Sequence, residues 1–258
     1  RYEAALARRV DHLMAVSDQD ARGLAALTGR SVTVVPNGID CDDFAPRPGP
    51  PSPPAEGETR IRPHHLLGAA GEASLAPPRL VFCATFDYRP NVDAAVWLVR
   101  AILPRVWAVR PDVRLTLVGR SPAPAVRALA GERVEVTGYV LDIRPRVWES
   151  DLYVVPLRAG GGTRFKVLEG LALGVPVLTT SLGAEGIGGQ PGEHYLVADG
   201  APAFASAILS AIDDGPRRRE LIQNGRQFVR SRYDWSVITP RLLDLYEAAR
   251  PLATGAIR

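Results

Sequence analysis

From residue 79 onward, short apolar runs alternate with stretches in which apolar residues recur at helical spacing. The runs are rich in Val and Leu, which is typical of strands buried on both faces of a sheet. The predicted strands are 80–84, 113–118, 134–136, 151–157, 175–180 and 195–197. The predicted helices are 92–107, 123–130, 143–149, one that follows Thr163, and three that begin at Pro202, Pro216 and Trp235. Repeated strand-then-helix order predicts an α/β fold with a parallel sheet flanked by helices.

The first 45 residues hold a smaller set of the same elements: helix 2–10, strand 12–16, a helix to about Leu27 and strand 31–35. Ser17 and Asp20 form a capping box for the second helix. Residues 46–78 are dense in Pro, Gly, Ala and Glu and have no sustained periodicity, which indicates a linker or a long surface insertion. We therefore predict three parts, residues 1–45, 46–78 and 79–258.

A glycine-rich segment follows the predicted strand 151–157. Gly160, Gly161 and Gly162 are free to take positive φ and let a ligand approach the backbone. We expect Thr163 to cap the next helix, which Gly174 ends. Free N–H groups at such a helix start suit a phosphate.

Arg164, Lys166 and Glu169 lie at the start of this helix. The helix dipole disfavours cations at that end, so the two cations indicate that an anion binds there. Lys166 is also the only lysine among 31 basic residues, and Lys and Arg are not interchangeable where a compact charge is needed. The alternative is that Lys166 and Glu169 form a surface pair of little energetic value. We favour a binding site.

The composition is typical of a globular protein and does not indicate a membrane-spanning, metal-binding or nucleic-acid-binding one. A chain of 258 residues, 46% hydrophobic, can bury one large core or two modest ones. No apolar run approaches the length of a membrane span, no signal peptide is visible, and the opening on Arg1 rather than Met suggests a fragment. Cys41 and Cys83 form no CxxC, which favours a reducing, cytoplasmic location and predicts no metal site. The net charge of +3, without a basic-aromatic stripe, does not indicate nucleic acid binding.

Ligands of open parallel sheets bind beyond the carboxyl ends of the strands. The loops expected there are 85–91, 119–121, 138–140, 160–164 and 181–186. No GxGxxG with a downstream acid follows the first strand of this region, so we expect no dinucleotide cofactor.

Several motifs are those of a known family: Val34-Val-Pro-Asn-Gly-Ile-Asp40 with Phe44, Asp87-Tyr-Arg-Pro-Asn-Val-Asp93, Val118-Gly-Arg120, Val136-Thr-Gly-Tyr-Val140, Gly161 to Pro176, Thr180-Ser-Leu-Gly-Ala-Glu-Gly186 and Arg232-Tyr-Asp-Trp235. With them the chain resembles the C-terminal, nucleotide-sugar-binding half of a GT-B glycosyltransferase of family 4 ("group 1"). The resemblance implies a GT-B type Rossmann-like domain in residues 79–258. It makes residues 1–45 the end of an N-terminal acceptor-binding domain and the crossover out of it, a small remnant of a second α/β domain.

The resemblance implies a retaining transfer of a sugar from a nucleotide diphosphate-sugar donor to a glycan or lipid-linked acceptor, without a cofactor or a required metal. It also implies polysaccharide or lipid-linked glycan assembly in the cytoplasm, at the inner face of the membrane, where peripheral association is expected. Any acceptor-positioning residue is expected in the missing half.

In the family, two acidic residues with seven residues between them mark the donor site. Glu169 matches the second, which hydrogen-bonds the ribose. The first falls on Gly161, so Glu185 in the next loop is our candidate for a sugar contact. The basic pair usual after the first strand is incomplete, because Thr85 and Pro90 occupy its positions.

The resemblance therefore yields two sets of site residues. The predicted catalytic set is Arg164, Lys166 and Glu169, whose cations stabilise the charge that develops on the leaving diphosphate. The predicted donor-binding set is Arg89, Gly119, Arg120, Tyr139, Val140, Gly161, Gly162, Thr163 and Glu185, with Arg89 at the diphosphate and residues 119, 120, 139 and 140 at the base.

Two other functions remain open on the same residues. One is a catalytically inactive nucleotide-binding module, with Gly161 marking a lost sugar contact. The other is a different GT-B-like enzyme, such as a sugar epimerase or a phosphorylase.

Overall fold

The computed structural model of the protein describes residues 2–47, 76–160, 162 and 164–249. These residues divide into two compact units. The larger unit is Cys41–Arg230, and the smaller one combines the described parts of Arg1–Asp40 and Ser231–Arg258.

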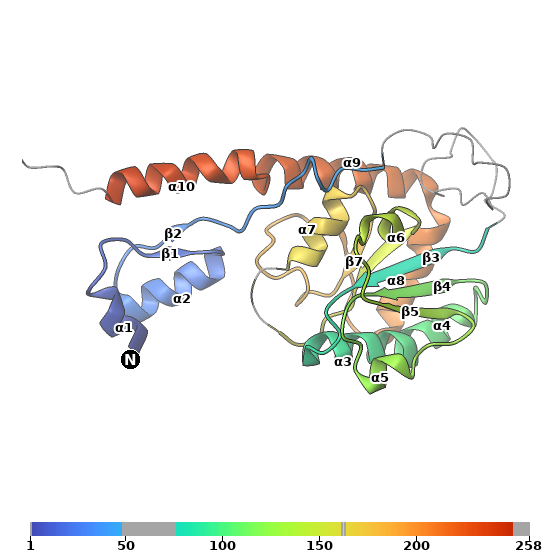
Figure 1. Cartoon of the computed structure of the whole chain (residues 1–258). Coiled ribbons are helices and arrows are strands. Elements are labelled where there is room, and N and C mark those ends of the chain that lie inside the picture. Colours follow the sequence, from blue (N-terminus) through green and yellow to red (C-terminus); the bar gives the residue numbers. More distant parts are fainter. Residues whose placement is uncertain (1, 48–75, 161, 163, 250–258) are drawn as a thin grey trace, which may run out of the picture. The chain divides into compact units, whose positions relative to one another are not determined.

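A six-stranded sheet forms the centre of the larger unit (Figure 1). Its strands are β3 (Arg79–Cys83), β4 (Arg114–Val118), β5 (Val134–Gly138), β6 (Leu152–Val155), β7 (Val177–Thr179) and β8 (Leu196–Val197). All neighbouring strands are parallel and their order is β5-β4-β3-β6-β7-β8. The order reverses between β3 and β6, as in doubly wound nucleotide-binding sheets.

Helices cover both faces of this sheet. They are α3 (Arg89–Trp97), the π-helical turn η2 (Leu98–Ile102), α4 (Leu103–Trp107), α5 (Pro124–Arg127), α6 (Arg144–Trp148), α7 (Phe165–Ala172), α8 (Ala201–Asp213) and α9 (Gly215–Arg232). α8 packs against α4 and η2 on one face, while α7 packs against β6 and β7 on the other. The predicted α/β class and parallel sheet are confirmed.

The predicted helix 92–107 forms as α3, η2 and α4 in succession. Pro104 has no N–H for a helical hydrogen bond, and its ring would crowd the carbonyl four residues earlier. The wider π turn that precedes it accommodates the proline without ending the helix.

The core explains why the strands read as continuous apolar runs. All four residues of β6 are buried, as are Leu80, Val81 and Phe82 of β3. α7 lies very close to the sheet at Gly170, where an added Cβ would be 2.8 Å from the Val177 side chain and 3.1 Å from that of Tyr153. This close packing fixes α7, and hence Lys166 and Glu169, against the sheet.

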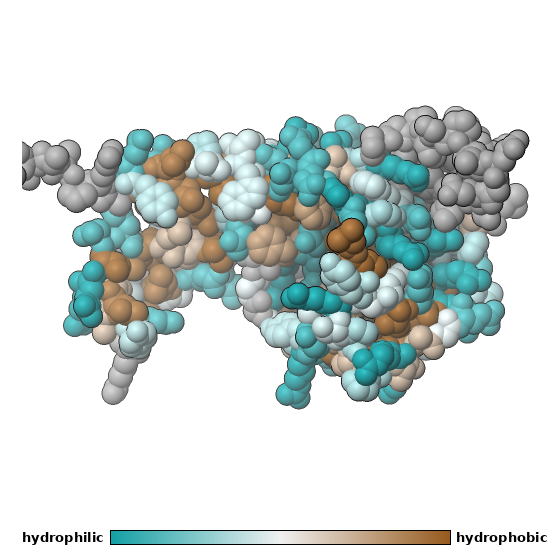
Figure 2. Space-filling model, viewed as in Figure 1, coloured by the Kyte–Doolittle hydropathy of each residue, from teal (hydrophilic) through white to brown (hydrophobic). Residues whose placement is uncertain are grey.

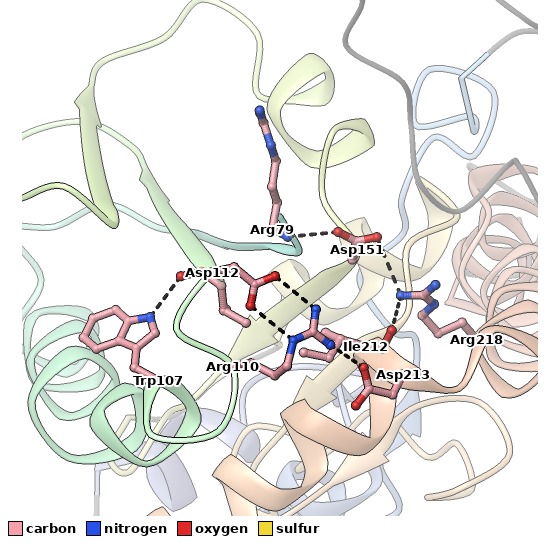
Figure 3. Close-up of polar contacts among 9 residues, drawn as sticks. Arg79, Trp107, Arg110, Asp112, Asp151, Ile212, Asp213 and Arg218 are labelled. Carbon is pink, nitrogen blue, oxygen red and sulfur yellow. Dashed lines mark hydrogen bonds and ion pairs between the residues drawn. The ribbon is translucent and has the colours of Figure 1, made fainter. Parts of the chain in front are cut away.

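A polar network fixes the amino edge of the sheet, opposite the carboxyl ends of the strands (Figure 3). The buried carboxylate of Asp151 accepts the backbone N–H of Arg79 at 2.9 Å and lies 3.6 Å from the Arg218 guanidinium. Arg110 pairs with Asp112 at 3.1 Å and with Asp213 at 2.6 Å. Because the network joins β3, the start of β6 and the α8–α9 corner, it holds their relative positions from the side away from the loops.

The smaller unit consists of α1 (Tyr2–Ala7), β1 (Met14–Ala15), α2 (Asp18–Thr28), β2 (Thr33–Val34) and α10 (Trp235–Ala249). β1 and β2 are parallel, which confirms the predicted second, small α/β piece. Ser17 caps α2 as predicted, because its hydroxyl accepts the backbone N–H of Asp20 at 3.1 Å. Large apolar side chains such as Leu6, Met14 and Leu27 are exposed, and Figure 2 shows hydrophobic (brown) residues gathered on this unit.

The predicted domains do not have the same boundaries as these two units. Contacts group the described part of Ser231–Arg258 with the first 40 residues. The assignments of 1–45 to an acceptor-binding domain, of 46–78 to a linker and of 79–258 to a donor-binding domain stay predictions. Most of 46–78 lies outside the described residues.

Candidate active site

A cavity of about 440 Å³ opens at the carboxyl edge of the sheet in the larger unit. It is lined by residues from the ends of β3, β4 and β5, from the first turns of α3 and α7, and from the loop before α6. They are Cys83, Ala84, Thr85, Asn91, Val118, Gly119, Arg120, Tyr139, Val140, Ile143, Phe165, Lys166 and Glu169. β3 ends in this wall, and α7 follows β6, so the cavity lies where the strand order reverses, as ligand sites of doubly wound sheets do.

Gly119 forms part of the cavity wall where β4 ends against β3. It has φ +152°, and an added Cβ would lie 1.7 Å from the carbonyl oxygen of Ala84, so only glycine fits here. Beyond it, the backbone N–H of Phe86 donates to the carbonyl of Arg120 at 3.0 Å. The loops after β3 and β4 are therefore joined where they line the cavity.

Lys166 reaches the cavity from the first turn of α7. Its Nζ donates a hydrogen bond to Asn91 Oδ1 at 3.1 Å, and this is its only hydrogen bond within the part of the chain that the structure describes. An ammonium has three N–H donors, so two can meet a ligand. Burial lowers the pKa of Lys166, while the carboxylate of Glu169 acts in the opposite direction.

Glu169 lines the same cavity one turn further along α7. Burial raises its pKa above the usual value of 4.5, and the charge of Lys166 opposes this rise. No group among the described residues donates a hydrogen bond to its carboxylate, so a ligand with hydroxyl groups can supply the donors that this half-buried group needs. Both residues line the cavity.

Arg164 and Glu185 lie outside this lining and pair with each other. Arg164 is only 5% exposed, and its Nη2 lies 3.6 Å from a carboxylate oxygen of Glu185. Its guanidinium also donates to the carbonyls of Leu182 at 3.1 Å and Gly160 at 3.0 Å. Arg164 therefore ties the glycine-rich loop to the 181–186 loop.

The family model described as "Glycosyl transferases group 1" matches residues 77–214, which is more than half of the chain. The chain belongs to this family.

Curated relatives of this group 1 family member include enzymes with different named products. Phosphatidyl-myo-inositol mannosyltransferase of Mycolicibacterium smegmatis is 27% identical over 245 residues, which cover 91% of this chain and 56% of that protein. Glycogen synthase of Mycobacterium tuberculosis is 26% identical over 195 residues, which cover 70% of this chain and 45% of that protein. The chain thus spans about half the length of these curated relatives.

Solved structures confirm the predicted GT-B type of fold. HepE of Anabaena in complex with UDP superposes with a TM-score of 0.73 at 18% identity, over 95% of this chain and 66% of that one. Sucrose-phosphate synthase of Thermosynechococcus elongatus gives a TM-score of 0.70 at 22% identity, over 95% of this chain and 60% of that one. At these identities the likeness concerns the fold alone.

The structure of this group 1 chain brings together about half of the predicted site residues. The cavity lining includes Gly119, Arg120, Tyr139, Val140, Lys166 and Glu169. Arg89, Arg164, Gly162 and Glu185 are outside it, and Gly161 and Thr163 lie outside the described residues. The binding roles assigned to these residues stay predictions.

One local prediction at the helix start needs correction. The N-cap of α7 is Arg164, with φ −86° and ψ 61°, and not Thr163, so the helix begins one residue later than expected. Because Arg164 points its guanidinium at the neighbouring loop carbonyls, it does not supply a cation to the cavity wall.

Sequence reasoning missed Asn91 and the Arg158–Asp93 pair. Asn91 falls in the loop 85–91 that was expected at the ligand edge, but nothing in the sequence indicates that its amide is buried beside Lys166. Arg158 makes hydrogen bonds of 3.1 and 2.6 Å to Asp93 and lies over the Trp97 ring at 4.9 Å. This contact joins the start of the glycine-rich loop to α3.

Over residues 2–47, 76–160, 162 and 164–249, no helix is both long and apolar enough to cross a membrane. The same residues contain no group of three or more His, Cys, Asp or Glu side chains that could hold a metal ion.

Proposed function

We propose that this chain is the donor-binding half of a retaining, family 4 hexosyltransferase. The enzyme would move a sugar from a nucleotide diphosphate-sugar to a glycan or lipid-linked acceptor. The observation that carries the proposal is the cavity at the reversal point of the sheet, whose lining includes Lys166 and Glu169 of α7 and Gly119 after β4. Family membership supports the reaction class.

The names of the relatives support the substrate classes. A mannosyltransferase acting on phosphatidyl-myo-inositol and a glycogen synthase are among them, and HepE is a structural neighbour solved with UDP. We propose by analogy that the enzyme works in the cytoplasm at the inner face of the membrane, in polysaccharide or lipid-linked glycan assembly, with only peripheral membrane association.

The cavity can be divided by chemistry. Lys166 offers two free N–H donors and a positive charge for the diphosphate, and Glu169 offers acceptors for the ribose hydroxyls. Arg120, Tyr139 and Val140 follow β4 and β5, which lie on the other side of β3 from β6, the strand that leads into α7, and this part of the lining suits the base. As the glycosidic bond breaks, negative charge develops on the leaving diphosphate, and a fixed ammonium stabilises it without a metal or another cofactor.

Glu169 gives this proposal a pH signature. We expect nucleotide affinity to fall on acidification, beginning at a higher pH than an ordinary glutamate would cause, because burial raises the pKa of Glu169 and only the ionised group accepts hydrogen bonds from both ribose hydroxyls. The stability of the free protein changes in the opposite direction. A carboxyl whose pKa is raised on folding increases the free energy of unfolding as the pH falls through that pKa.

Calorimetric titration from about pH 4 to about pH 8 measures the affinity. Glu169→Gln is the matched control, because it keeps the shape and removes the titration, while the titration of the phosphate itself remains. An acid limb that is the same in both proteins would contradict the assignment of Glu169 to the ribose.

The proposed function is tested by a thermal-shift series with UDP, GDP, ADP and TDP, each compared with its monophosphate and its nucleoside. A ligand that binds only the folded state raises the melting temperature according to RT ln(1 + [L]/Kd). We expect one base to give the largest shift and the order diphosphate, monophosphate, nucleoside within it. Equal shifts for the three forms, or none at about 1,000-fold excess over a micromolar Kd, would contradict a donor site.

The inactive module is the second candidate, since Gly161 stands at the family's first acid. Binding of a nucleotide sugar by the intact protein, without its consumption in the presence of an acceptor extract, would favour that candidate.

A further inference from the structure

Asn91 is a buried polar side chain in the wall of the cavity, in the first turn of α3. It is 5% exposed, and both ends of its amide are in use. Its Nδ2 donates to the carbonyl of Thr85 at 2.9 Å, and its Oδ1 accepts from Lys166 Nζ at 3.1 Å. The opposite amide orientation would place an NH₂ against an ammonium and an oxygen against a carbonyl, so these two partners fix the direction of the amide.

The backbone around Asn91 is held firmly. Its own N–H donates to the carbonyl of Tyr88 at 2.9 Å, which closes the turn at the start of α3. The loop that carries Thr85 is joined to the loop after β4, because Phe86 bonds both to Arg120 at 3.0 Å and to Ala123 at 3.0 Å. The carbonyl that orients Asn91 therefore belongs to a fixed part of the wall.

The lysine on the other side needs such a partner. Lys166 has a flexible four-carbon stem, and ordering it costs rotamer entropy. Glu169 lies three residues further along the same helix, so an ammonium without another partner could turn toward that carboxylate. Its positive charge would then be less available to a bound anion. Asn91 instead offers a neutral oxygen from a different element, which holds the ammonium at α3 without adding a negative charge beside it.

We propose that Asn91 is the positioning residue for the diphosphate of the donor: it directs the ammonium of Lys166 from α7 to the end of β3, where it meets the phosphates. This inference rests on the proposed function. It assigns Asn91 no contact with the reacting atoms, and it explains how the single lysine of the chain can serve a site whose wall is formed mainly by β3 and β4.

The groups around Lys166 determine how a substitution of Asn91 should change the pKa of the lysine. Glu169 raises the pKa of the lysine, and Arg164 at the start of α7 lowers it. Cys83 on β3 is neutral near pH 7, because burial raises the pKa of its thiol to about 12. The Asn91 oxygen stabilises the charged ammonium by accepting a hydrogen bond from it, so removing that oxygen should lower the pKa of Lys166 further.

Because Lys166 is the only lysine, growth on lysine labelled with ¹³C at Cε places one NMR probe in the site. Two variants of similar shape separate the two contacts of Asn91. Asn91→Leu and Asn91→Asp both lose the bond to the Thr85 carbonyl and should lose stability alike. They differ at the lysine, where we expect Leu to lower the pKa of Lys166 and Asp to raise it.

Inorganic pyrophosphate is the probe for the anion, followed through the same resonance. We expect both variants to bind it about tenfold more weakly than the unchanged protein, Leu because the ammonium is no longer directed and Asp because its charge repels the anion. A purely structural role would instead leave the pKa of Lys166 and the pyrophosphate affinity of Asn91→Leu as they are in the unchanged protein. Asn224→Leu, on α9, is the control and should change neither the pKa nor the affinity.

The outcomes distinguish this inference from the proposed function. Pyrophosphate affinity or lysine pKa unchanged in Asn91→Leu, or a Lys166 resonance that does not respond to pyrophosphate in the unchanged protein, would overturn the positioning role. A normal pyrophosphate response without any response to nucleoside diphosphates would overturn the proposed function and leave the positioning of Lys166 standing.

Discussion

Lys166→Met should weaken the binding of a nucleoside diphosphate about 100-fold, or about 2.8 kcal/mol. Lys166 is the only basic side chain that α7 places in the cavity lining, and losing one partner of a partly buried, hydrogen-bonded charge pair costs about 2–5 kcal/mol. The melting temperature of the free protein should change little. Two effects on stability oppose each other. Removing the ammonium removes the cost of burying a charge, while the oxygen of Asn91 loses its hydrogen-bond donor.

Isothermal titration with the nucleotide that gives the largest thermal shift measures this loss. Arg89→Met is the comparison, because the sequence also predicts Arg89 at the diphosphate, whereas in the structure Arg89 is exposed at the start of α3 and lies outside the cavity lining. We expect at most a twofold change for it. If Arg89→Met cost as much as Lys166→Met, the diphosphate would lie toward the outer end of α3, and the assignment of Lys166 would be wrong.

The fold could be predicted from the sequence because each element is locally consistent. β6 is apolar throughout since both of its faces are buried, and Ser17 with Asp20 identifies the start of α2. The parallel sheet followed from strand-helix alternation, but the order β5-β4-β3-β6-β7-β8 depends on which strands meet in space. The reversal point that locates the cavity was therefore not predictable from periodicity.

Site residues could be predicted where their place in a loop or helix puts them at the cavity. They were harder to predict where a long side chain can bind to more than one partner. Gly119 and Glu169 occur in the loop and helix where a ligand was expected, and both line the cavity. Arg164 was expected at the same anion as Lys166, yet it bonds to the carbonyls of Leu182 and Gly160. That choice is made by a loop 18 residues away in sequence, which no local pattern reveals.

Asn91 shows the same limit from the other direction. In the sequence it ends the loop 85–91, where a ligand was expected, and in the structure it is a buried amide that bridges Thr85 and Lys166. The bridge joins residues 75 positions apart. The lone lysine was a sequence signal, but its partner became visible only once α3 and α7 were placed at the same edge of the sheet.

Gly119→Ala should be among the most damaging single substitutions in the larger unit. The added methyl would lie 1.7 Å from the carbonyl oxygen of Ala84, and φ +152° is a conformation that an L side chain rarely adopts. Neither atom can move alone, because Ala84 donates its own N–H to the carbonyl of Val118 at 2.9 Å. Steric overlap and backbone strain together should cost about 3–5 kcal/mol of unfolding free energy.

Urea denaturation followed by far-UV circular dichroism measures this loss, with Gly131→Ala as the matched control. Gly131 lies in the following β4–β5 connection, has no atom within 4 Å of an added Cβ and no positive φ, so its substitution should stay within about 0.5 kcal/mol. The same clash should also weaken nucleotide binding. Relieving it would require the ends of β3 and β4 to move apart, and both ends line the cavity. A Gly119→Ala protein with unchanged stability and nucleotide affinity would show that the two strands do not approach each other so closely, and the cavity would have to be formed in another way.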